Sequence, residues 1–166
     1  MSPELILQTL VNSIQLSSFY ALLAIGLSLV FGVAGIANLA HGEFFMLGAY
    51  SVWWFSTLSG LNYCVSVVLA MVVVGVLGII VEKLIFKPLR GNVLSVAIIS
   101  VGLMFIIQVI IGQIWGLGFP KRVDDPMGGS LNIGGVFIGY HRMIILTASI
   151  FLLIALWAFL HRTKYG

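Results

Sequence analysis

Long apolar runs, separated by short polar stretches, dominate the pattern of residues along this chain. A helix needs about 20 mostly apolar residues to cross the hydrocarbon core of a bilayer, which is about 30 Å thick. Five runs reach or approach that length, and we expect helices over residues 5–34, 44–61, 63–81, 93–115 and 143–160. The pattern therefore predicts an all-α fold, a polytopic transmembrane helical bundle of about five membrane segments.

Composition indicates that lipid is the solvent for much of this chain. Of its 166 residues, 61% are hydrophobic and 8% are charged, whereas soluble domains average about 45–50% apolar and about 25% charged residues. The eight Lys and Arg residues lie in short stretches between the apolar runs. Such a distribution is typical of topology determinants and not of a nucleic-acid-binding patch, so nucleic acid is excluded as a partner.

Basic residues between the third and fourth runs predict the orientation in the membrane. Lys83, Lys87 and Arg90 lie there, and cytoplasmic loops carry an excess of Lys and Arg. The chain also has a basic stretch at residues 161–166. With five crossings, the N-terminus is expected outside and the C-terminus in the cytoplasm.

Polar residues also occur in two other places. The first run has a polar front of Asn12, Ser13, Gln15, Ser17 and Ser18, which should face other helices or water because unpaired polar groups are costly in hydrocarbon. The second place is the connection between the fourth and fifth runs, on the outer side. There, two short apolar stretches with the alternation of β-strands, residues 131–133 and 136–138, flank Gly134 and Gly135, which predicts a small outer β-hairpin. The hairpin would stiffen the loop or serve as a docking surface for an external partner.

The least ordinary stretch contains Asn38, His41, Gly42 and Glu43 between two apolar runs. An ionised carboxylate at the bilayer centre costs about 2.5–3.5 kcal/mol on insertion scales. One interpretation is a broken helix whose backbone and polar side chains line a translocation path. The other, which spacing alone favours, is a tight cytoplasmic turn in which Asn38 caps the second helix and Glu43 lies in its first turn.

Signatures of catalysis and of cofactor binding are missing from the sequence. It contains no Gly-x-x-x-x-Gly-Lys-Ser/Thr motif, no Gly-x-Ser-x-Gly motif and no His-Glu-x-x-His motif. Cys64 is its one cysteine, so an intrachain disulfide is excluded. We expect neither an enzyme nor a metal or cofactor site.

Several stretches of the sequence together carry a resemblance to a known family. The most specific is Asn38-Leu-Ala-His41-Gly42-Glu43 with the following Gly48-Ala-Tyr50, preceded by the glycine-punctuated residues 24–35. These residues resemble the permease subunits of branched-chain amino acid ABC importers. Residues 82–91 are similar to the family's first basic loop, residues 100–116 to its fourth segment and residues 129–136 to its outer hairpin. The resemblance covers essentially the whole chain.

This resemblance implies a permease that translocates leucine, isoleucine, valine or close analogues across the bacterial or archaeal plasma (inner) membrane. It implies four kinds of partner: a second homologous permease subunit, two cytoplasmic ATPase subunits, an extracytoplasmic substrate-binding protein and membrane lipid. Some relatives carry urea or short amides, and no residue here separates these substrates. Family members are considerably longer, so residues 1–166 are expected to be a single transmembrane permease domain, truncated before the cytoplasmic coupling loop.

Two other functions fit the apolar pattern. A small stand-alone membrane scaffold or accessory subunit would use the glycine-rich helix faces only for packing. A secondary transporter with a carboxylate relay is disfavoured, because Glu43 is the one acidic residue near a membrane path apart from the loop-facing Glu82.

Overall fold

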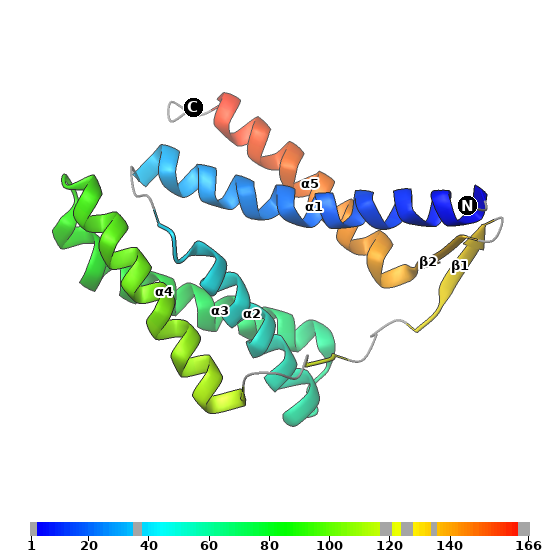
Figure 1. Cartoon of the computed structure of the whole chain (residues 1–166), viewed down its shortest axis with the longest axis horizontal. Coiled ribbons are helices and arrows are strands. Elements are labelled where there is room, and N and C mark those ends of the chain that lie inside the picture. Colours follow the sequence, from blue (N-terminus) through cyan, green and yellow to red (C-terminus); the bar gives the residue numbers. More distant parts are fainter. Residues whose placement is uncertain (1–2, 35–37, 117–120, 124–127, 134–135, 163–166) are drawn as a thin grey trace. The chain divides into compact units, whose positions relative to one another are not determined.

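The computed structural model of the chain describes residues 3–34, 38–116, 121–123, 128–133 and 136–162. Within these residues the structure is helical apart from one small sheet (Figure 1). Its elements are α1 (Pro3–Ala34), α2 (His41–Trp53), the π-helical η1 (Trp54–Leu58), α3 (Tyr63–Val81), the π-helical η2 (Glu82–Phe86), the 3₁₀-helical η3 (Lys87–Leu89), α4 (Val93–Trp115), β1 (Ser130–Ile133), β2 (Val136–Gly139) and α5 (Tyr140–Arg162). The predicted all-α class is confirmed.

Four helices of the described chain are long and apolar enough to cross a membrane. They cover Glu4–Gly32, Tyr63–Leu89, Val93–Trp115 and Tyr140–Ala158. The second expected segment also folds as a helix, α2 continued by η1, but it is not one of these four. The difference has a local cause, because the helix begins with the polar residues His41 and Glu43 and α2 itself has only 13 residues.

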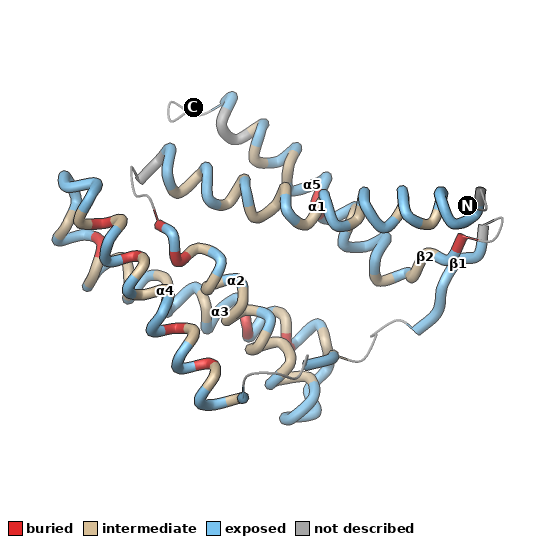
Figure 2. Tube along the Cα trace, in the orientation of Figure 1, coloured by how far each residue is buried: buried red, intermediate tan, exposed pale blue. Residues whose placement is uncertain are grey.

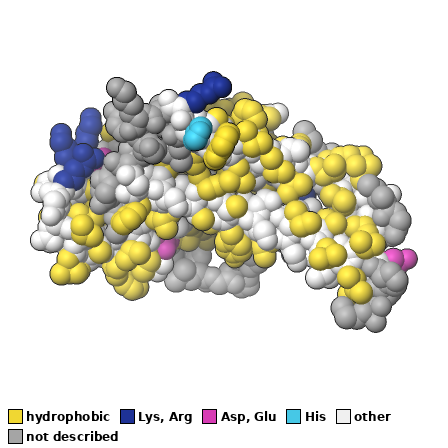
Figure 3. All heavy atoms as spheres, turned by 90° about the horizontal axis from the view of Figure 1, so that it is seen from above, with side chains coloured by type: hydrophobic (Ala, Val, Ile, Leu, Met, Phe, Trp, Pro, Cys, Tyr) yellow, Lys and Arg dark blue, Asp and Glu magenta, His cyan; other side chains and the backbone are white. Residues whose placement is uncertain are grey.

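Most side chains of the four spans are not covered by other parts of the chain. At most 22% of the residues in any span are buried, and Figure 2 shows long exposed stretches on every helix. In the space-filling view of Figure 3, hydrophobic side chains cover much of the visible surface. Soluble monomers rarely expose apolar surface on this scale, so lipid or partner helices must cover these faces.

The chain divides into two compact units. The hairpin unit comprises residues 1–28 and 125–166, and the junction unit comprises residues 29–124. Helix α1 contributes to both. Each unit has its own polar site, and the two sites are described separately below.

In the junction unit, α2 packs against α3 and α4. Helix α4 buries Val96, Ser100, Ile107 and Ile111, whose spacing of four, seven and four residues places them along one side of a helix. Both long helices begin at an asparagine: the Oδ1 atom of Asn62 accepts a hydrogen bond from the Cys64 amide, and that of Asn92 from the Ser95 amide. These side chains satisfy amides that the first helical turn leaves unpaired.

In the hairpin unit, β1 and β2 form an antiparallel pair in which Ile133 lies opposite Val136. The predicted hairpin is thus confirmed, while its Gly134–Gly135 connection lies outside the described residues. Strand β2 leads directly into α5, whose first residue is Tyr140. The hairpin therefore fixes where α5 begins.

Candidate functional site

The start of α2 is built on a tight turn around Asn38. The side-chain Oδ1 of Asn38 accepts a hydrogen bond of 3.0 Å from the Ala40 amide, and its backbone carbonyl accepts one of 3.3 Å from the His41 amide. Both Asn38 and Ala40 are buried. Ala40 is the N-cap of α2, and no side chain caps the helix. Asn38 therefore stabilises the turn ahead of α2. The turn interpretation from the sequence, in which Asn38 caps α2, is wrong on this point.

Helix α4 holds this turn at a serine. The Leu39 amide donates a hydrogen bond of 3.1 Å to the hydroxyl of Ser100, and that hydroxyl donates one of 2.7 Å to the Ala97 carbonyl. Ser100 is fully buried. A buried hydroxyl that both donates and accepts fixes the position of the backbone bonded to it.

A second contact between α2 and α4 involves Glu43. The Gln108 side chain donates a hydrogen bond of 2.7 Å from Nε2 to Oε1 of Glu43. Glu43 is half-buried and lies in the first turn of α2, as the turn interpretation expects; there the helix dipole favours a negative charge. Its hydrogen-bond partner in the described part of the chain is a neutral amide. The carboxylate of Glu43 therefore lies next to α4, and no cation among the described residues pairs with its Oε1 atom.

Sequence reasoning did not single out Ser100 or Gln108 as site residues. The signal was present, because each is a polar residue inside an apolar run of 23 residues. Polar side chains within membrane helices generally face other helices or a water-filled path.

A pocket of about 500 Å³ opens beside the turn. Its polar lining consists of Asn38, His41, Glu82 and Arg90, and the last two form an ion pair through Glu82 Oε1 and Arg90 Nη2. The remaining lining is apolar and comes from the end of α1, α2, α3 and η2: Leu29, Val30, Phe44, Val74, Gly78, Val81 and Phe86. The pocket thus combines one balanced pair of charges with apolar walls.

The structure brings only some of the predicted site residues together. Asn38, His41 and Arg90 line the same pocket, although the sequence pattern placed them in two separate groups. Gly42 and Glu43 follow on the first turn of α2, and a Cβ atom at Gly42 would meet no atom within 4 Å. Lys83 and Lys87 are exposed and do not line the pocket.

Aromatic side chains gather where α2 and α4 end. The ring of Tyr50 stacks on that of Trp115 with centroids 5.2 Å apart, and Trp54 meets Trp115 edge-on at 5.9 Å. The ammonium group of Lys121 lies 5.2 Å from the ring centroid of Trp53. Since α2 and α4 both begin near the pocket, the junction unit has a charged, polar end and an aromatic end. Aromatic residues at the ends of membrane segments are typical of the lipid–water interface.

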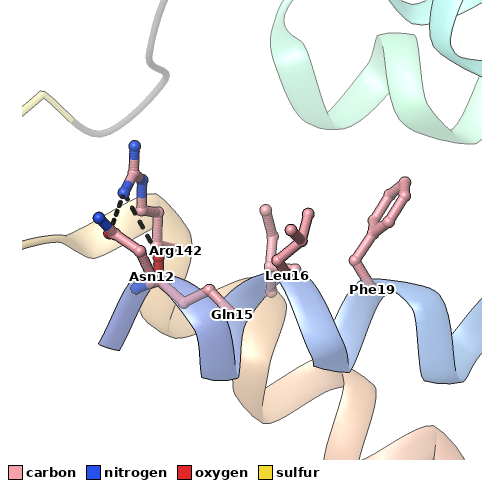
Figure 4. A pocket seen from close by; sticks show the side chains of 6 residues that line it. Asn12, Gln15, Leu16, Phe19 and Arg142 are labelled. Atoms are coloured by element: carbon pink, nitrogen blue, oxygen red, sulfur yellow. Dashed lines mark hydrogen bonds between the residues drawn. The ribbon is translucent and has the colours of Figure 1, made fainter. Parts of the chain in front are cut away.

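The polar front of α1 has partners in the hairpin unit. Gln8 makes two hydrogen bonds with the backbone of Phe137, one from its Nε2 to the carbonyl (3.1 Å) and one from the amide to its Oε1 (2.8 Å). Arg142 donates from Nη1 to Oδ1 of Asn12 at 3.1 Å and to Oε1 of Gln15 at 3.4 Å (Figure 4). Asn12 and Gln15 thus face α5, as expected, whereas the hydroxyls of Ser13 and Ser18 donate to carbonyls of their own helix.

Comparison with known proteins decides the family. The family described as "Branched-chain amino acid transport system / permease component" matches residues 9–166. This chain belongs to that family. No solved structure gives a significant match to it.

Curated relatives of the permease family come from bacteria and archaea. The high-affinity branched-chain amino acid transport system permease protein BraD of Pseudomonas aeruginosa is 31% identical, over 96% of this chain and 56% of BraD. The corresponding LivH protein of Escherichia coli K12 is 32% identical, over 61% of this chain and 36% of LivH. The probable permease LivH of Methanocaldococcus jannaschii is 28% identical, over 90% and 49%. The chain spans about half the length of the curated relatives it matches.

Family membership bears on the kind of chemistry to expect from these residues. The relatives are named as transport permeases and not as enzymes. Within the described residues, no group of three or more His, Cys, Asp and Glu side chains could hold a metal ion. The pocket at the start of α2 offers hydrogen bonds, one ion pair and apolar contacts, which are means of binding.

Proposed function

We propose that this chain is part of a membrane-spanning permease subunit of an ABC importer that translocates branched-chain amino acids or close analogues. The observation that carries the proposal is the family match over residues 9–166. The printed name of BraD, which aligns with 96% of this chain, supports the substrate class. Four helices able to cross a membrane support the location.

The pocket at the start of α2 is a section of the transport path in this proposal. A branched-chain amino acid carries one positive charge, one negative charge and an aliphatic side chain. The Glu82–Arg90 pair and the walls from Val74 and Val81 complement these three features. Asn38, His41, Gly42 and Glu43 then form a helix break that lines the path and fixes the start of α2.

The two ends of the junction unit support an orientation for the proposed subunit. Lys83, Lys87 and Arg90 lie at the polar end, which is cytoplasmic by the positive-inside rule, and the tryptophans of the aromatic end lie at the outer interface. Helices α2 and η1 together extend for about 25 Å. In this proposal α2 therefore also crosses the membrane, between α1 and α3, and is less apolar than the four other spans. The N-terminus is then outside and the C-terminus cytoplasmic, in the inner membrane of a bacterium or archaeon.

The proposed subunit works with partners. A second homologous permease completes the path, two cytoplasmic ATPases supply the energy, and an extracytoplasmic binding protein delivers the substrate. Residues 1–166 belong to one transmembrane permease domain in this proposal. The subunit itself catalyses no reaction and carries no cofactor.

Deletion of the gene for the full-length protein tests this function in the native host. ATP-dependent uptake of radiolabelled leucine, isoleucine and valine should fall to background and return when the gene is supplied on a plasmid. Uptake of lysine serves as the control and should not change. Full uptake of all three branched-chain amino acids by the deletion strain contradicts the proposal. Loss of urea or acetamide uptake instead assigns the subunit to a different substrate class.

A further inference from the structure

Arg142 lies at the start of α5 in an environment unlike that of Arg90. Its Nη1 atom donates to the amide oxygens of Asn12 and Gln15, and both of these groups are neutral. In the part of the chain that the structure describes, the ion pair found is that between Arg90 and Glu82. The positive charge of Arg142 is therefore held in place by described residues but is not compensated by them.

The hydrogen bonds of Arg142 to described residues use only one nitrogen of its guanidinium group. The guanidinium has five N–H groups in a planar fork that matches the two oxygens of a carboxylate. The hydrogen bonds of Arg142 to described residues all come from Nη1. No hydrogen bond from Nη2 or Nε to a described residue competes with an anion for the two-pronged geometry that guanidinium groups favour.

The cluster is held by the hairpin. The Oδ1 atom of Asn12 also accepts a hydrogen bond of 3.4 Å from Gln8, and Gln8 is bonded twice to the backbone of β2 at Phe137. Strand β2 leads directly into α5, which carries Arg142. The amides and the guanidinium are thus part of one connected network in the absence of a ligand.

Beside this network lies a cavity of about 360 Å³, lined by Asn12, Gln15, Leu16, Phe19, Arg142 and Ile145. Residues 12, 16 and 19 of α1 follow one another at helical spacing, so they share one side of the helix, and Figure 4 shows Leu16 and Phe19 projecting on the same side of the ribbon. The cavity is an open depression at the surface with mostly apolar walls, and Asn12, Gln15 and Arg142 are its polar lining residues. This arrangement complements a small molecule with a carboxylate at one end and a branched hydrocarbon group at the other.

We propose that Arg142, oriented by Asn12 and Gln15, binds the α-carboxylate of an aliphatic amino acid in this cavity. Leu16, Phe19 and Ile145 contact its side chain. The inference rests on the proposed function, and it adds a substrate subsite in the hairpin unit, separate from the pocket at the start of α2. In the proposed orientation the subsite lies at the outer side, where substrate arrives.

Binding to the assembled importer tests the subsite without interference from the binding protein. The full-length permease is purified with its partner permease and ATPases, placed in phosphatidylcholine nanodiscs, and titrated with tritiated leucine. We expect saturable binding that 4-methylpentanoate, which keeps the carboxylate, competes away and that leucinamide, which lacks it, does not. No saturable leucine binding, or equal competition by leucinamide, overturns the inference.

Variants assign the binding to Arg142. Arg142→Met should weaken leucine binding about 10- to 100-fold, the equivalent of one charge-assisted hydrogen-bonded pair, and Arg142→Lys should weaken it less. The matched control is Arg162→Met, which removes a cation from the last turn of the same helix and should leave binding unchanged. Gel filtration and basal ATPase activity verify that each complex is assembled. If Arg142→Met does not assemble, Arg142→Lys and the two competitors decide.

An anionic lipid headgroup, like a carboxylate, is negatively charged and could also bind Arg142. A further measurement distinguishes lipid binding from amino acid binding. If Arg142→Met releases a co-purified anionic lipid and leaves leucine binding unchanged, Arg142 is a lipid site and the inference fails. That failure is distinct from failure of the proposed function: an importer that takes up leucine normally with Arg142→Met retains the function and lacks the subsite. A wild-type importer that moves no branched-chain amino acid contradicts the function itself.

Discussion

The pocket at the start of α2 and the cavity beside Arg142 are made of similar parts, an arginine, amide side chains and apolar walls. In the first, Arg90 is paired with Glu82, whereas in the second Arg142 is bonded to the amides of Asn12 and Gln15. A balanced pair can close a path until a zwitterion replaces both contacts. A cation such as Arg142, which no described residue compensates, attracts an anion from solution. In the two proposals, the partner of an arginine, more than its presence, indicates the role of the site.

The two sites also differ in what holds them. The start of α2 is attached to another helix, through Ser100 and Gln108 of α4. The Arg142 cluster is attached to a hairpin, through Gln8 and the backbone of Phe137. Loss of a contact between two helices should destabilise the fold, whereas a change in the hairpin should affect Arg142 as well. Four substitutions test this difference, each measured by equilibrium unfolding of the purified full-length protein in mixed micelles.

Gln108→Leu should have the largest effect. It leaves Oε1 of Glu43 without its hydrogen-bond donor in a partly buried place, and bonds to charged groups are worth about 1.5–3 kcal/mol. We expect a loss of that size in the free energy of unfolding. Gln113→Leu on the same helix is the control, because Gln113 is exposed, and it should change stability by less than about 0.5 kcal/mol. Equal effects of both substitutions would show that the contact between Glu43 and Gln108 contributes no stability.

Gly129→Ala should cost about 2 kcal/mol, the middle of the range for strained backbone. Gly129 has φ = +125°, and a Cβ atom there would lie 3.1 Å from the ring of Tyr140. Leucine binding to the importer should weaken too, since Tyr140 is two residues before Arg142. Gly102→Ala is the matched control: its Cβ would meet no atom within 4 Å, and alanine favours a helix. Unchanged stability and binding in Gly129→Ala would show that the hairpin does not position Arg142.

Ser100→Ala should cost about 1 kcal/mol, the typical value for one hydrogen bond, because the Leu39 amide loses its acceptor. Ser149→Ala is a close control. Ser149 is equally buried, but the hydroxyl bond described for it goes to Ile145 of its own helix, so its loss should be smaller. If Ser149→Ala destabilises as much as Ser100→Ala, the anchor between the turn and α4 carries no special weight.

Glu82→Gln should have the smallest effect on stability. The side chains of Arg90 and Glu82 are 53% and 34% exposed, and exposed ion pairs contribute about 0.2–1 kcal/mol. The double substitution Glu82→Arg with Arg90→Glu should regain that small loss. A loss above about 2 kcal/mol for Glu82→Gln would mean that the pair holds the fold together. The proposal that this ion pair closes the path until a zwitterionic substrate replaces it would then be wrong.

The sequence predicted the elements better than the contacts. Apolar runs predicted the four spanning helices because burial in lipid depends on the residues of one segment alone. The Gly134–Gly135 pair predicted the hairpin for a similar reason, since short connections are local. The apolar residues of the second segment predicted a membrane crossing. In the structure this segment is not one of the four long apolar spans, because its helix begins with the polar residues His41 and Glu43.

The candidate site could be predicted only in part. Asn38, His41 and Glu43 stood out because polar residues between apolar runs are unusual. Their partners did not, because Glu43 and Gln108 are separated by 65 residues and the period of a pattern gives the face of a helix, not the helix opposite. The pairing of Arg90 with Glu82 also depends on the path of the chain. The chain turns through η3 between these two residues, and this turn brings Arg90 back to the end of α3.

The central claim, that the pocket at the start of α2 is a cytoplasm-facing section of the transport path, is tested most directly by cysteine labelling at His41. The exposed Cys64 is first replaced by serine, and His41→Cys is compared with Ile106→Cys on an exposed apolar face of α4. In inverted vesicles with the whole importer, a membrane-impermeant thiosulfonate should modify His41→Cys, at a rate that changes when ATP is trapped, and should not modify Ile106→Cys. An unreactive His41→Cys, or one with the same rate in both nucleotide states, would contradict the account.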